Sequence, residues 1–170
     1  MVGRLSYNPQ YRRNLPHYQP PGATFFVTFR LAGSLPLELL RQWREEADAR
    51  ERVTAALPLR EREQQQYEDH KRAFGRYNAE MDRAAYGPTW LREPSVAVVV
   101  NDAILARHGQ LYDLDAFTIM PNHVHLVFTP LPTDDGYISL PSIMHSLKRG
   151  TAWRANTALG RKGAYWQHES

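Results

Sequence analysis

Alternating apolar and polar residues predict three β-strands in this chain. Residues 24–31 form the first, since most of them are β-branched or aromatic. Residues 112–120 and 123–129 form the second and third, with Pro121-Asn122 as the interruption between them. Strict alternation along the second strand divides its side chains between two faces, with Leu114, Ala116 and Thr118 on one and Phe117 and Ile119 on the other.

Apolar residues recur at helical spacing in three further segments, at about 37–57, 94–108 and 140–159. Residues 59–85 are different, because they are highly polar and consist mostly of helix-forming residues. This segment carries much of the acidic charge of the chain. It therefore predicts a polar helical insertion that is solvated and does not contact DNA.

The segments near the two ends complete the pattern. Pro, Tyr, Asn and Arg dominate residues 7–22, which predicts an irregular arm, and residues 164–167 favour a further short strand. Strands that alternate with helices in this order predict an α+β fold, in which helices pack on a central antiparallel sheet. We expect an N-terminal arm at 1–22 and one domain at 23–170.

Composition excludes several classes of protein. The 170 residues are 42% hydrophobic and contain no apolar run long enough to span a bilayer, so no membrane partner is expected. The first residues lack the apolar core of a signal peptide, which favours the cytoplasm. No cysteine is present, so any metal must be held by His, carboxylate, amide or water.

The net charge of +3 is unevenly distributed. Residues 1–33 hold four arginines and no acid, and residues 141–170 hold five basic residues and one acid, which leaves −5 for residues 34–140. Two basic ends around an acidic middle favour a polyanionic partner. An ordinary basic surface explains the charge alone equally well.

The sequence His123-Val124-His125 lies in the third predicted strand. Side chains two residues apart on a strand share a face, so both imidazoles project together and can chelate a metal. A further ligand would have to come from a Gln, Glu, Asp or His elsewhere. The spacing by itself favours a structural or surface role, because such pairs are common by chance. The other five histidines show no ligand spacing, and we expect them to be incidental; these are His17, His70, His108, His145 and His168.

The context of the pair is more specific. The segment Ile119-Met120-Pro121-Asn122-His123-Val124-His125-Leu126-Val127-Phe128 resembles the signature of the HUH nucleases, in which U is a hydrophobic residue. It is most similar to the REP-associated tyrosine transposases, which are insertion-sequence-200-like, single-tyrosine enzymes. Further similarity covers most of the chain, at Tyr18, 21–36, 87–91, 146–148, Asn156, 159–161 and 166–169.

This resemblance implies a ferredoxin-like HUH fold and a DNA-processing activity. Members bind single-stranded DNA and small hairpins of repetitive palindromic elements. A tyrosine hydroxyl attacks a phosphodiester, which leaves a 5′-phosphotyrosine and a free 3′-hydroxyl. By the same resemblance, His123 and His125 would hold Mg²⁺ or Mn²⁺, and the protein would act as a monomer or homodimer in the cytoplasm, associated with the nucleoid.

The nucleophilic tyrosine of the family lies on a helix downstream of the segment that resembles Trp166-Gln167-His168-Glu169. We therefore expect this tyrosine, and a further polar metal ligand, beyond Ser170, in which case the chain is truncated before its catalytic helix and contains no catalytic residue. Tyr137 and Tyr165 lie nearest to the motif, and we interpret both as structural or surface residues.

Basic residues with aromatic neighbours indicate where DNA would bind, since cations neutralise phosphates and aromatic rings stack on unpaired bases. We expect Trp153, within the last cluster, to be a core residue of its helix. The predicted DNA-binding residues are Arg12, Arg13, Lys148, Arg149, Arg154, Arg161 and Lys162.

Three functions stay open at this point. The first is a tyrosine transposase or HUH endonuclease domain. The second is a non-catalytic module that binds DNA hairpins and keeps a vestigial metal site. The third is a metal-dependent hydrolase that uses the two histidines with water as the nucleophile.

Overall fold

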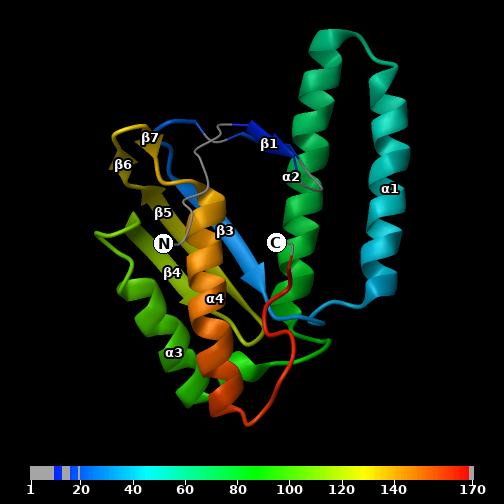
Figure 1. Cartoon of the computed structure of the whole chain (residues 1–170). Helices are drawn as coiled ribbons and strands as arrows, with labels where there is room; N and C mark the ends of the chain where they lie inside the picture. Colours follow the sequence, from blue (N-terminus) through cyan, green and yellow to red (C-terminus); the bar gives the residue numbers. More distant parts are fainter. Residues whose placement is uncertain (1–9, 13–15, 19, 169–170) are drawn as a thin grey trace. The chain divides into compact units, whose positions relative to one another are not determined.

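A three-stranded antiparallel sheet carries the histidine pair in the computed structural model (Figure 1). Its strands are β3 (Phe25–Arg30), β4 (Tyr112–Ile119) and β5 (His123–Pro130), in the order β3-β5-β4. The central strand β5 is hydrogen-bonded on both sides. The three strands predicted from alternation are confirmed, and so is the α+β class.

The structure describes residues 10–12, 16–18 and 20–168. They divide into two compact units. The sheet unit comprises the chain up to Ala32 and again from Trp90, and the helical unit comprises Gly33–Thr89. The polar segment expected as an insertion thus lies in the helical unit, together with the helix expected at about 37–57.

Two helices cover one face of the sheet, α3 (Pro94–Leu105) and α4 (Leu140–Ala158), and a short 3-10 helix, η1 (Trp90–Arg92), precedes α3 (Figure 1). The Ser139 hydroxyl caps α4 by accepting a hydrogen bond from the Ser142 amide. The core lies between these helices and the sheet. Many of its buried members come from α3, α4 and the inner face of β5; these include Val96, Val100, Ile104, Val124, Leu126, Phe128, Ile143 and Leu147.

The predicted division of side chains along β4 is wrong at one position. Leu114 lies opposite Phe128 while Ala116 lies opposite Val127, so Asp115 is an extra residue in the strand. Such a β-bulge changes the alternation by one residue. Leu114 therefore shares the core-facing side with Phe117 and Ile119, whose partners also belong to the inner face of β5.

Two segments differ from the expected irregular or extended structure. The arm expected to be irregular contains the pair β1 (Gln10–Arg12) and β2 (Pro16–Tyr18), which are antiparallel neighbours. Pro16 is tolerated because it is the first residue of its strand. The strand expected at 164–167 is reduced to one bridge between Leu31 and Trp166. A small hairpin that we did not predict joins β6 (Pro132–Thr133) to β7 (Gly136–Tyr137).

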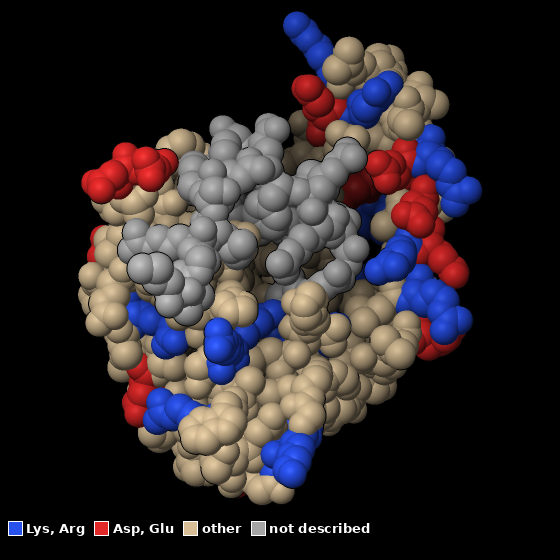
Figure 2. All heavy atoms as spheres, viewed as in Figure 1, with Lys and Arg blue, Asp and Glu red and all other residues tan. Residues whose placement is uncertain are grey.

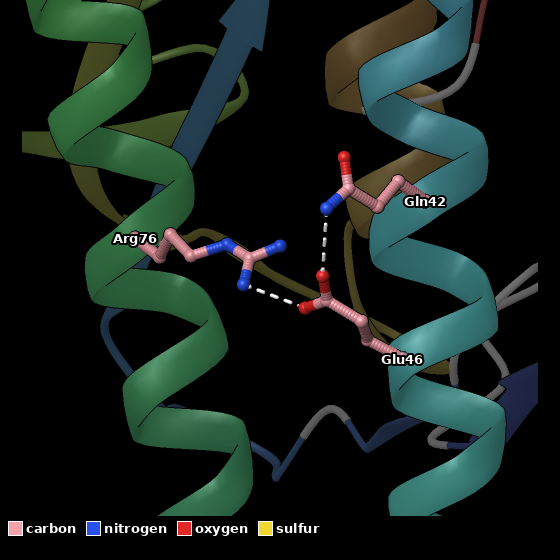
Figure 3. Close-up of polar contacts among 3 residues, drawn as sticks. All are labelled: Gln42, Glu46 and Arg76. Atoms are coloured by element: carbon pink, nitrogen blue, oxygen red, sulfur yellow. Dashed lines mark hydrogen bonds and ion pairs between the residues drawn. The ribbon is translucent and has the colours of Figure 1, made fainter.

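The helical unit is a pair of helices, α1 (Leu37–Ala55) and α2 (Leu59–Arg83), as the sequence predicted. Figure 3 shows how they are linked. Arg76 donates to Glu46 at 2.7 Å, and Gln42 donates to the same carboxylate at 3.1 Å. The bond from Arg76 lowers the pKa of Glu46. The Arg76 guanidinium also lies over the ring of Trp43, at 4.8 Å from its centroid.

Gly87 closes this unit at a position where only glycine fits. Its φ of +65° is left-handed, and a Cβ there would lie 2.0 Å from the carbonyl oxygen of Gly33. Across the described parts of both units, every helix is too short or too polar to cross a bilayer.

Two buried tyrosines of the sheet unit provide a test of the core. Tyr112 donates its hydroxyl hydrogen to the carbonyl oxygen of Ile104 at 2.8 Å, whereas the Tyr165 hydroxyl has no partner among the described residues. We expect Tyr165→Phe to leave the free energy of unfolding unchanged or raised, because it removes an unpaired buried hydroxyl. Tyr112→Phe should lower it by about 1 kcal/mol, since the bond to Ile104 is lost. Urea unfolding at pH 7 measures both changes. A larger loss of stability in Tyr165→Phe than in Tyr112→Phe would contradict the hydrogen bonding described for the two hydroxyls.

The same tyrosines give the stability of the protein a pH dependence. Burial disfavours the phenolate, so it raises the pKa of Tyr112 to about 12 and also raises that of Tyr165. The unfolded chain therefore loses these protons at lower pH than the folded chain. The contribution of these two tyrosines to the free energy of unfolding should be fully present below about pH 10, and it should fall as the pH rises from there towards the folded pKa values. The fall in the free energy of unfolding with rising pH should be smaller in Tyr112→Phe, because one of the two tyrosines is then missing.

Candidate metal centre and nucleic-acid surface

His123 and His125 project from the same face of β5. Their cross-strand neighbours on that face are Arg30 and Thr28 of β3, and Thr118 of β4 lies opposite His125. Val124, between the two histidines, points the other way and is fully buried in the core. The strand thus anchors the pair through one face and presents two imidazoles on the other.

The two rings meet through their ε nitrogens. The Nε2 atoms lie 2.9 Å apart, and the ring planes are nearly perpendicular, at 79°. The Nδ1 atom of each ring makes a hydrogen bond to a neighbouring side chain. His123 Nδ1 lies 2.7 Å from Asn122 Oδ1, and His125 Nδ1 lies 2.9 Å from Thr28 Oγ1. A hydrogen bond at Nδ1 therefore orients each ring.

These bonds indicate which nitrogen of each ring faces a metal ligand position. An amide oxygen only accepts, so His123 Nδ1 donates to Asn122, and the neutral form of this ring would carry its lone pair at Nε2. Thr28 can accept from His125 in the same way. Histidines that bind metals usually donate their other N–H to such a group. The donor set therefore suits a divalent ion.

The pair lies in a partly apolar environment. His123 is fully buried and His125 is half-buried. The ring of Phe26 lies 5.2 Å from that of His125 and is tilted by 30°, while about half of the Phe26 side chain is exposed. The two Nε2 atoms can share one proton or hold one cation, and a cation would replace that proton.

The predicted DNA-binding residues of α4 and the following turn divide into two groups. Arg149, Arg154 and Lys162 are exposed. Figure 2 shows Lys and Arg side chains gathered over the area of α4. Arg12 lies in β1, where only the backbone is described, and Arg13 lies outside the described residues.

Lys148 and Arg161 instead support the chain that follows α4. Lys148 donates to the carbonyl oxygen of Gln167 at 2.8 Å. Arg161 donates to Asn156 Oδ1 and to the carbonyl oxygen of Ala164, and its guanidinium lies 3.8 Å from the ring centroid of Trp90. Both residues are half-buried, so their charges are less available to a phosphate than those of the exposed group.

Trp153 is not a core residue, contrary to the expectation from sequence. Its side chain is 73% exposed. The buried face of α4 consists of Ile143, Leu147, Thr151 and Ala155, at a spacing of four residues. Trp153 lies midway between the last two of these in sequence, which places it on the opposite side of the helix.

The two tyrosines nearest the motif have different environments. Tyr165 is buried in the core, and burial raises the pKa of its hydroxyl, which opposes formation of a nucleophilic phenolate. Tyr137 is half-buried in β7, where its hydroxyl lies close to Gly22.

No family model, no curated protein and no solved structure matches this chain.

Proposed function

We propose that this protein binds single-stranded or hairpin DNA and cleaves and rejoins it through a phosphotyrosine intermediate, as a transposase of the REP-associated, HUH type with a ferredoxin-like fold. The observation that carries the proposal is the convergence of His123 and His125 on one face of the central strand, with 2.9 Å between their Nε2 atoms. The hydrogen bonds to Asn122 and Thr28 support it, because they orient both rings for metal binding.

His123 and His125 would hold a divalent ion, which polarises and orients a scissile phosphate when bound. Imidazole binds many divalent metals. The choice of Mg²⁺ or Mn²⁺ therefore rests on the sequence resemblance. The residues of the chain perform the rest: Asn122 and Thr28 fix the imidazoles, and the exposed cations near α4 neutralise phosphates of the bound strand. We assign the nucleophile to none of the tyrosines within residues 20–168.

A second candidate is a non-catalytic module that binds DNA hairpins with a vestigial metal site. The same 2.9 Å distance favours it, since a single shared proton satisfies both Nε2 atoms without an ion. The two functions differ in whether the pair takes up Mn²⁺. A covalent adduct with DNA would support the first, and it further requires the nucleophilic tyrosine, which we assign to none of the tyrosines within residues 20–168. For either function the resemblance suggests a monomer or homodimer associated with the nucleoid.

Fluorescence anisotropy with a 5′-labelled DNA hairpin that has a single-stranded flank tests DNA binding. The triple variant Arg149→Ala/Arg154→Ala/Lys162→Ala should bind about tenfold or more weakly, because three phosphate contacts are lost. The slope of log affinity against log salt should fall by about 2 to 3, at roughly 0.7–0.9 per contact. Incubation with Mn²⁺ and a denaturing gel then reports any covalent adduct.

The matched control is Arg41→Ala/Arg72→Ala/Arg83→Ala in the helical unit, where the three side chains are 64%, 70% and 72% exposed. It removes the same charge and should leave binding almost unchanged. Equal losses in both triple variants would show that net charge alone attracts the DNA. Absence of binding by the unmodified protein would contradict both candidate functions.

A further inference from the structure

An exposed stripe follows one side of α4. His145, Arg149, Trp153 and Thr157 recur every four residues, and all four are exposed. Residues four apart on a helix lie on the same side, one turn above another. The stripe therefore places a cation and the Trp153 indole on consecutive turns of one surface.

A hollow lies at the end of this stripe, where α4 gives way to the turn Gly160–Gly163. Its volume is about 560 Å³, and both Trp153 and Lys162 line it. Gly160 and Gly163 form part of its lining. An added Cβ on Gly160 would meet nothing within 4 Å, so the turn leaves this space open. The volume falls in the range of sites that hold small molecules.

The chemistry of the hollow selects an aromatic anion. An exposed indole offers a flat surface on which any nucleobase can stack. Lys162 is exposed, and Arg161 is held in place by Asn156, so two positive charges lie at the same site. Residues 140–168 contain no Asp or Glu, so no acidic side chain of this segment opposes a phosphate.

We propose that this hollow binds one unpaired nucleotide of single-stranded DNA, with its base stacked on Trp153 and its phosphate beside Lys162. A base inside a duplex has both faces covered by its neighbours, so the site discriminates unpaired from paired nucleotides. The inference rests on the proposed function and names the part of the DNA that this surface recognises. Helix α4 covers the face of the sheet opposite to the histidines, so this contact and metal binding are separable.

Trp153→Ala and Trp153→Phe in the whole chain test the site with two DNA hairpins, one blunt and one with a single-stranded flank. Trp153→Ala should bind the flanked hairpin about tenfold more weakly. Trp153→Phe should keep most of the affinity, because an aromatic ring remains. Neither variant should change binding of the blunt hairpin or of Mn²⁺. Tyr67→Ala, which removes a 64% exposed aromatic ring from α2, is the matched control and should bind both hairpins as the unmodified protein does.

Abasic substitutions along the flank locate the nucleotide. At one position, loss of the base should weaken binding by the unmodified protein about as much as Trp153→Ala does, and the two changes together should weaken it no further. Unchanged affinity of Trp153→Ala for the flanked hairpin would overturn the inference and leave the proposed function standing. An equal loss for the blunt hairpin would also overturn it, since the contact would then be with the stem. If the unmodified protein binds neither hairpin, both proposals fail.

Discussion

The double variant His123→Ala/His125→Ala is expected to lose Mn²⁺ binding, with affinity reduced by at least about 100-fold. The double substitution removes both nitrogen ligands, so the divalent ion loses the imidazoles that would hold it. The two Nε2 atoms, 2.9 Å apart, belong to one donor set, so each single variant should also weaken binding substantially. Isothermal titration calorimetry with Mn²⁺ gives the affinity, and the electron paramagnetic resonance of free Mn²⁺ gives an independent value.

The matched control is His145→Ala/His168→Ala, because both of these histidines are exposed. It removes the same number of imidazoles and should leave the titration unchanged. A titration that is equally weak for the unmodified protein and for His123→Ala/His125→Ala would show that the pair binds no Mn²⁺. That result would favour the non-catalytic DNA-binding module. Circular dichroism establishes that the double variant is folded.

The substitution Leu126→Ala is expected to lower the free energy of unfolding by about 2–5 kcal/mol. Leu126 is fully buried in the centre of β5, between Val27 of β3 and Phe117 of β4. Truncation removes apolar contacts and leaves a cavity that the two flanking strands cannot readily fill. Urea unfolding, followed by circular dichroism, measures the change.

Leu37→Ala is the control, since the Leu37 side chain is 80% exposed and should contribute less than about 0.5 kcal/mol. If Leu126→Ala does not fold, Leu126→Val removes less volume and should still lower stability by more than the control does. Equal stability of Leu126→Val and Leu37→Ala would contradict the position of Leu126 in the core.

Periodicity in the sequence was sufficient for the helices and for the three main strands, because each signal arises from residues close together in the chain. It failed at Asp115, where one extra residue moves Leu114 to the other face of β4. Nothing in the local alternation distinguishes a bulge from a regular strand, since the bulge depends on the register with β5. It failed also at Trp153, where hydrophobic character predicted burial but the spacing of the buried residues in α4 leaves the indole outside.

The basic cluster after the motif illustrates a second limit. The five cations look alike in sequence, yet Lys148 and Arg161 are hydrogen-bonded to the chain that follows α4 whereas the other three are exposed. The difference depends on where the carbonyl oxygens of Gln167 and Ala164 lie after folding. A helical wheel contains no information about either position.

The sequence by itself determined that His123 and His125 share a face, because side chains alternate along any strand whatever surrounds it. The tertiary structure alone decided what those imidazoles can do. Thr28, which fixes His125, is 97 residues away in the chain and reaches it only through the register of β3 with β5. The distance between the two Nε2 atoms likewise depends on ring orientations that Asn122 and Thr28 impose. Contacts of this kind arise from packing between distant segments, and that packing is set by the whole core rather than by the motif.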